Sequence, residues 1–176
     1  MKDEMYKKEF IDLISTIKNQ AIEAKSPVGK SEKDFDYSRG KIMGYYSIVT
    51  LLKHQAFAFC IDQEELGLSD IDPETDLLGL HKNPNMDFGE DNWAIDIMSK
   101  KKIKGYLIDS IKILKNQAIE AKKAAENPKN GDEDYNNGEM GAYREVLSTI
   151  KKNISLFDLK QEDIGLEDVD PERDLI

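Results

Sequence analysis

Acidic side chains stand at every second position in two segments of this chain. They are Asp70, Asp72, Glu74 and Asp76 in the first segment and Asp168, Asp170, Glu172 and Asp174 in the second. Alternating carboxylates can supply the oxygen ligands that calcium prefers, but a calcium-binding helix–loop–helix needs glycine where Thr75 stands and glutamate where His81 stands. Asp72-Pro73-Glu74 and Asp170-Pro171-Glu172 instead favour helix starts, with aspartate as cap and proline in the first turn. A calcium-like metal site in these segments is kept as the weaker alternative.

A second pattern pairs two aspartates with a tyrosine and a glycine. It comprises Asp34, Asp36, Tyr37 and Gly40, and again Asp132, Asp134, Tyr135 and Gly138. Two carboxylates beside an aromatic ring could bind a cation or a basic side chain. The structural interpretation is a capped helix start with an anchoring tyrosine and a glycine where two helices touch. The four-residue spacing of Gly40 and Gly44 favours this close packing.

A third polar group lies within the peptide KNQAIEAK, which occurs at residues 18–25 and again at 115–122. Its polar members are Asn19, Gln20 and Glu23, and Asn116, Gln117 and Glu120. Gln20 flanks an apolar stripe and could reach the interior of a bundle. A di-metal site in a four-helix bundle would need a Glu-x-x-His motif on each of two helices, and these segments contain no histidine. A solvated or boundary position is therefore favoured.

All three patterns belong to one longer repetition. The KNQAIEAK copies are 97 positions apart, and DIDPETDLL at residues 70–78 returns as DVDPERDLI at 168–176, 98 positions on. The repetition predicts two copies of one helical unit. We expect residues 1–78 to form the first helical hairpin, 79–92 a connector, and 93–176 the second hairpin with an extra N-terminal helical segment. We expect the two hairpins to share one core.

Apolar residues at three- and four-residue steps predict the helices of each hairpin. The first helix should run from near Asp3 to about Lys25, and the second should be capped by Asp34 or Asp36, or by Asp132 or Asp134 in the other copy. In the third helical stretch, Gly105 could mark a bend or a break. The core faces are Ile11, Ile14, Ile17, Ala21 and Ala24, then Tyr37, Tyr45, Ile48, Val49, Leu52, Ala56 and Phe59, with matching residues in the second copy. The predicted fold is all-α, a tandem duplication of a helical hairpin that packs as a four-helix-bundle-like domain with short extra helices.

The charge of the chain restricts its partners. The formal net charge is -10, with -5 up to Leu78 and -5 beyond it. An acidic surface repels phosphate backbones and anionic lipid, so we expect no nucleic-acid and no membrane partner. It suits a basic protein, although acidity also serves solubility alone.

Recognisable catalytic chemistry is missing from the sequence. Cys60 is the only cysteine, His54 and His81 do not recur in the other copy, and no nucleophile–base pair, phosphate loop or zinc spacing occurs. We expect no cofactor. The start of the chain mixes charges and does not resemble a signal peptide, so we expect a cytoplasmic location.

These observations predict a non-enzymatic acidic helical module that binds a basic protein, such as an antitoxin or immunity protein that covers a toxin. The expected binding residues are Asp34, Asp36, Tyr37, Asp132, Asp134 and Tyr135. The alternatives are metal binding through the alternating carboxylates, a carboxylate enzyme beside Tyr45 and Tyr143, and a structural role through self-association. We expect a monomer rather than a homodimer, because the duplication already supplies a pseudo-twofold within one chain.

Overall fold

The computed structural model describes residues 2–25, 31–80, 98–129, 131–167 and 169–175. Within these ranges four long helices form the body of the molecule: α1 (Lys2–Glu23), α2 (Glu32–Ala58), α3 (Lys100–Glu126) and α4 (Glu133–Asn153). The short helical elements are η1 (Pro73–Leu77), η2 (Ile154–Phe157), η3 (Glu162–Ile164) and α5 (Pro171–Asp174). The described ranges contain no strand. The predicted all-α bundle with short extra helices is confirmed.

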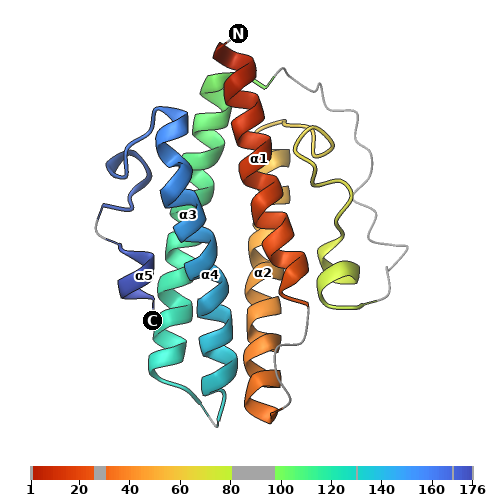
Figure 1. Ribbon diagram of the computed structural model, residues 1–176, viewed down its shortest axis with the longest axis vertical. Helices are drawn as coiled ribbons and strands as arrows, with labels where there is room; N and C mark the ends of the chain where they lie inside the picture. The colour runs from red at the N-terminus through yellow and green to blue at the C-terminus, as the bar shows by residue number, and fades with distance from the viewer. Residues whose placement is uncertain (1, 26–30, 81–97, 130, 168, 176) are drawn as a thin grey trace.

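The four long helices alternate in direction along the chain. In Figure 1, α1 and α3 run downward, whereas α2 and α4 both begin at the lower end and run upward. Among the described elements, α2 and α4 share the most extensive contact. Two helices that are distant in sequence therefore lie parallel and present their N-termini at the same end.

Most residues of the predicted apolar stripes form the core, whereas Ile11 and Tyr37 are only half-buried. Ile14 and Ile17 of α1 and Leu114 of α3 are almost completely buried, and the buried hydrophobic side chains of all four helices belong to one cluster. The Phe10 ring stands edge-on to Tyr106 with ring centroids 5.1 Å apart, and it lies 6.4 Å from Phe157. The core thus joins residues from both sequence copies. The domain boundaries and the duplication itself stay predictions.

Glycines allow α2 and α4 to touch along their backbones. A Cβ atom on Gly40 would lie 1.8 Å from the Tyr135 carbonyl oxygen, and one on Gly138 would lie 1.9 Å from the Tyr37 carbonyl oxygen. Only glycine fits at such a distance, because side chains need room that the neighbouring backbone occupies. The close-packing interpretation of Gly40 is confirmed, and this contact sets the two Asp-Tyr patterns side by side.

The start of α2 corrects a sequence prediction. Ser31, not Asp34 or Asp36, is the N-cap, and its hydroxyl accepts a hydrogen bond from the Asp34 N–H at 3.2 Å. The Asp34 carboxylate in turn accepts from the Ser31 N–H at 3.2 Å, which completes a capping box. In α4, Asp132 does hold the N-cap position, but its side chain makes no cap hydrogen bond.

The start and course of α3 also differ from expectation. Ser99 caps the helix by accepting from the Lys102 N–H at 3.3 Å, so α3 begins at Lys100. The helix break considered at Gly105 is absent, because α3 continues unbroken through this residue. A Cβ there would lie 2.8 Å from the Phe59 ring, so Gly105 serves packing against that ring. Residues 93–97 of the predicted extra helical segment lie outside the described ranges.

Lysine side chains hydrogen-bond the segments that follow α2 and α4 to the bundle through matching contacts. Cys60 and Asp158, which end these helical stretches, both adopt a left-handed φ of 49°. Four lysine ammonium groups donate to backbone carbonyls: Lys53 to Ile71, Lys151 to Val169, Lys18 to Gly67 and Lys115 to Gly165. The two segments are therefore held against the bundle in the same way.

The contacts of the Asp158 carboxylate predict that the free energy of unfolding falls at acidic pH. Lys100, 2.7 Å away, and the Tyr6 hydroxyl donate to this carboxylate, which lowers the pKa of Asp158 to about 2. A carboxyl whose folded pKa is depressed stabilises the fold above its unfolded pKa of about 3.9, and this stabilisation is lost as the pH falls toward 2. Asp158→Asn should therefore destabilise the protein at pH 7, and the difference from wild type should shrink between pH 4 and pH 2. Urea unfolding at several pH values measures it.

Lys100→Met provides the control for this prediction. In that background the Asp158→Asn difference should be smaller and should depend less on pH, because the main donor is gone. A difference that stays constant from pH 7 to pH 2 would contradict the assignment.

Candidate functional site

The parallel start of α2 and α4 concentrates negative charge at one end of the bundle. We define the acidic end as residues 31–40 and 131–140. These twenty positions carry seven acidic and two basic residues, a formal charge of -5, which is half of the chain's -10. The positive ends of two helix dipoles partly offset this charge and stabilise the carboxylates there. The acidic end is therefore a stable pair of helix starts that carries an excess of negative charge.

A hollow of about 300 Å³ opens between the two helix starts. It is lined by Asp36, Arg39, Gly131, Asp132, Tyr135 and Asn136. Asp36 and Arg39 form an ion pair at 3.5 Å, with 39% and 60% of their side chains exposed. A pair this exposed contributes little to stability. An incoming cation can therefore replace Arg39 at Asp36 at low cost.

The structure gathers half of the predicted binding residues around this hollow. Asp36, Asp132 and Tyr135 line it together. Asp34 is engaged in the capping box, and Asp134 lies half-buried in the first turn of α4. Tyr37 lines a different hollow, where its hydroxyl approaches Gly141 of α4.

Two ionisable groups on α4 near this end are shifted by burial. Burial raises the pKa of the Tyr135 phenol, and the nearby Glu139 carboxylate adds to this effect. Burial also raises the pKa of Glu139 itself. Tyr135 therefore stays neutral at physiological pH and offers its ring face, which attracts cations by its quadrupole.

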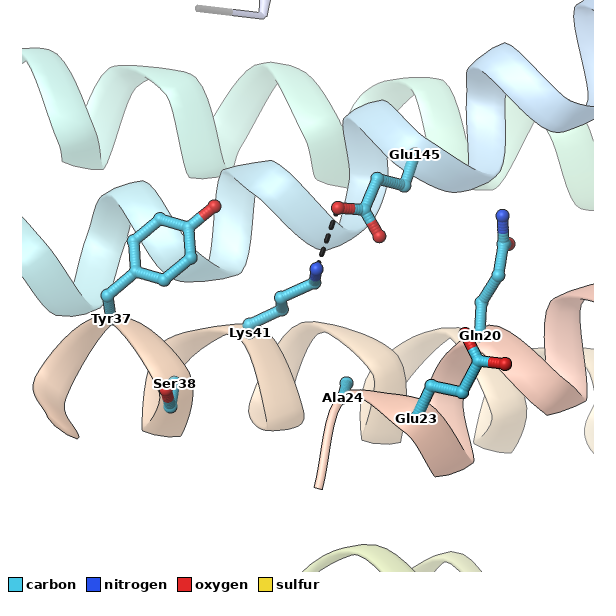
Figure 2. A pocket seen from close by; sticks show the side chains of 7 residues that line it. All are labelled: Gln20, Glu23, Ala24, Tyr37, Ser38, Lys41 and Glu145. Carbon is cyan, nitrogen blue, oxygen red and sulfur yellow. Dashed lines mark hydrogen bonds and ion pairs between the residues drawn. The ribbon is translucent and has the colours of Figure 1, made fainter. Parts of the chain in front are cut away.

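A second hollow, of about 220 Å³, was not foreseen as a site. Figure 2 shows its seven lining side chains, which are Gln20, Glu23, Ala24, Tyr37, Ser38, Lys41 and Glu145. We call it the Gln20 hollow. Burial, together with a hydrogen bond to Glu145, raises the pKa of the adjacent Tyr45 phenol. The sequence had singled out Gln20, Glu23 and Tyr37, but in two separate patterns that nothing in the sequence joins.

The alternating carboxylates mostly serve the backbone and neighbouring lysines. Asp72 caps η1 by accepting from the Thr75 N–H at 3.1 Å, and Asp76 accepts from the Asp72 N–H at 2.7 Å. Asp70 pairs with Lys18 at 2.9 Å, which lowers the pKa of this aspartate. The predicted helix start at Asp72 is confirmed.

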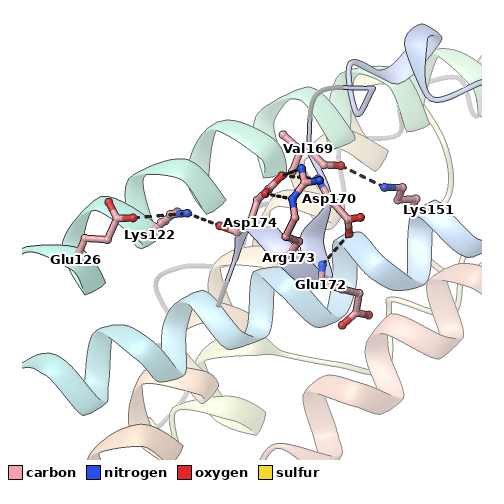
Figure 3. A network of polar contacts seen from close by, with 8 residues as sticks. All are labelled: Lys122, Glu126, Lys151, Val169, Asp170, Glu172, Arg173 and Asp174. Atoms are coloured by element: carbon pink, nitrogen blue, oxygen red, sulfur yellow. Dashed lines mark hydrogen bonds and ion pairs between the residues drawn. The ribbon is translucent and has the colours of Figure 1, made fainter.

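The second acidic segment is held in the same manner (Figure 3). Asp170 caps α5 and accepts from the Glu172 N–H at 3.2 Å, while Asp174 accepts from the Asp170 N–H at 2.8 Å. Arg173 adds two hydrogen bonds to Asp174. Asp168 lies outside the described ranges. In the described part of the chain, no three His, Cys, Asp or Glu side chains are grouped to hold a metal ion.

The remaining reactive residues that the structure describes, His54 and Cys60, line neither hollow. His54 and Cys60 are exposed, and His81 lies outside the described ranges. Among the helices that the structure describes, none has the length and apolarity to cross a bilayer.

Comparison with protein-family models, with curated proteins and with solved structures found no match to this chain. The function must therefore be judged from the geometry and charge of the molecule.

Proposed function

We propose that this chain is a non-enzymatic protein-binding module that covers a basic partner with its acidic end. The observation that supports this most is the convergence of Asp36, Asp132 and Tyr135, which come from segments almost one hundred residues apart, around one hollow. The twenty positions of this end carry a formal charge of -5. An antitoxin or immunity protein that neutralises a basic toxin is the concrete form of the proposal.

The hollow suits a lysine or arginine side chain of the partner. Asp36 and Asp132 supply carboxylates, and the Tyr135 ring supplies a face for a cation. The surrounding charge attracts a basic surface from a distance, which raises the association rate at low salt. Because exposed charges are screened within about 8 Å at physiological ionic strength, binding should weaken as salt is added.

The test is affinity capture from a lysate of the native organism with wild-type protein and with the triple variant Asp36→Asn, Asp132→Asn, Asp134→Asn. Wild type should recover a basic protein at low salt. The variant should recover at least about ten times less, because each lost charge contact contributes on the order of 1 kcal/mol in a partly exposed interface. Asp34 is left unchanged so that the cap of α2 is preserved.

A second triple variant, Asp12→Asn, Asp109→Asn, Glu167→Gln, provides the matched control. These residues are exposed, lie outside the acidic end and give the same change in net charge. Capture by the control should resemble wild type. Equal loss in both variants, or recovery of no specific basic protein by wild type, would refute the proposal.

A further inference from the structure

The Gln20 hollow is built by three helices at a point where polar groups enter the bundle. Gln20, Glu23 and Ala24 come from the end of α1, Tyr37, Ser38 and Lys41 from the start of α2, and Glu145 from the middle of α4. Its volume is about 220 Å³. A protein cavity of about 150 Å³ holds benzene, so the hollow can hold a ligand of slightly larger size.

An ion pair forms one wall of the Gln20 hollow. Lys41 Nζ lies 2.7 Å from Glu145 Oε1 (Figure 2). The buried Tyr45 hydroxyl donates to Glu145 Oε2 at 2.7 Å. The Lys41 and Glu145 side chains are 24% and 34% exposed, so the pair is partly open to the hollow. Because Lys41 is neutralised by Glu145, this wall does not repel a cation as a free lysine would.

Gln20 leaves a hydrogen-bond acceptor without a partner. Its Nε2 donates to Thr149 Oγ1 at 2.9 Å, and Thr149 Oγ1 donates to the Glu145 carbonyl at 2.9 Å. The Gln20 Oε1 atom is buried, and no described group donates to it. A buried acceptor in this state is unfavourable, so a ligand N–H group that reaches it as the Gln20 side chain turns toward the hollow gains from pairing with it.

The charge of the lining selects the sign of the ligand. Glu23 and Glu145 carry two negative charges and Lys41 carries one positive charge, so the lining has a formal charge of -1. Glu23 is exposed at the rim, and its charge is close enough to disfavour ionisation of Tyr45. Several acceptors and one excess negative charge fit a ligand with several N–H donors and a positive charge.

We propose that the Gln20 hollow binds a small organic cation, an alkylammonium or guanidinium compound, whose N–H groups donate to Gln20 Oε1, Glu23 and Glu145. This binding does not depend on a protein partner at the acidic end. Glu23 is not part of that end, so the two proposals can fail separately.

The test is a titration of the full-length ¹⁵N-labelled protein with 1,4-diaminobutane and with agmatine, followed by NMR. The side-chain amide of Gln20 and the backbone amides around Lys41 and Glu145 should shift together, with a dissociation constant of about 1 mM or tighter. Neutral 1,4-butanediol, which has the same chain length, should bind at least about tenfold more weakly, because it lacks the charge.

Matched variants decide whether the binding is specific. Glu23→Gln should weaken binding of 1,4-diaminobutane about tenfold, whereas Glu120→Gln should leave it unchanged. Glu120 is the counterpart of Glu23 in the second KNQAIEAK copy, is exposed and does not line the hollow. No shift at 10 mM diamine, equal binding of the diol, or equal effects of the two variants would overturn the proposal.

Discussion

Replacing Gly40 or Gly138 by alanine should destabilise the protein by about 3 kcal/mol or more, beyond the usual cost of overpacking. Each new methyl group would lie less than 2 Å from a backbone carbonyl oxygen of the facing helix. A side chain can rotate away from such a clash, but a helical backbone cannot, so α2 and α4 would have to separate. Urea unfolding followed by circular dichroism measures the change in the free energy of unfolding.

Gly105→Ala is the matched control for this experiment. Its Cβ would meet the edge of the Phe59 ring at 2.8 Å, and a ring can shift more easily than a helix backbone. Alanine is also favoured over glycine inside a helix by about 1 kcal/mol, which offsets the contact. Gly105→Ala should therefore change stability by less than about 1 kcal/mol. Equal effects at Gly40 and Gly105 would contradict the close contact of α2 and α4.

Phe10→Ala should destabilise the protein by about 3 to 5 kcal/mol, the usual range for a phenylalanine removed from a core. Phe10 is completely buried between Tyr106 of α3 and Phe157 of η2. Because these partners belong to the other sequence copy, both halves should unfold together in a single transition. Circular dichroism and hydrogen exchange resolved by residue should give the same free energy for core amides of α1 and α3.

Phe35→Ala makes the same chemical change at the surface. The Phe35 side chain is 63% exposed on α2, so its loss should change the free energy of unfolding by less than about 0.5 kcal/mol. Two separate unfolding transitions, or a Phe10→Ala effect as small as that of Phe35→Ala, would show that the hairpins do not share a core.

Helix periodicity was enough to predict the main features of the fold. The stripes that include Ile14, Ile17 and Leu114 are set by a helix period that acts within a few residues, and they point to the core as expected. The cap of α2 differs from the predicted Asp34 or Asp36, because Ser31 stands three residues before Asp34 and completes a capping box with it. The helix break considered at Gly105 rested on helix propensity, which packing against Phe59 overrides.

The candidate site was harder to predict, because it depends on the direction of α2 relative to α4. Counted along the chain, the charge is divided equally between the two halves, and the parallel starts of α2 and α4 bring together the -5 of residues 31–40 and 131–140. Lys41 and Glu145 are 104 residues apart, so no local pattern joins them. The Asp-Tyr pattern stands out in the sequence because it is repeated. The Gln20 hollow is instead lined by residues that differ between the two copies.

Hydrogen exchange of the protein in complex with the captured basic partner tests the central claim most directly. The first amides of a helix have no intrahelical acceptor and exchange quickly unless something covers them. If the acidic end is the binding surface, the amides at the starts of α2 and α4 should exchange at least about tenfold more slowly in the complex, while the middle of α1 stays unchanged. Unchanged exchange at both helix starts, with protection on another surface, would contradict the account.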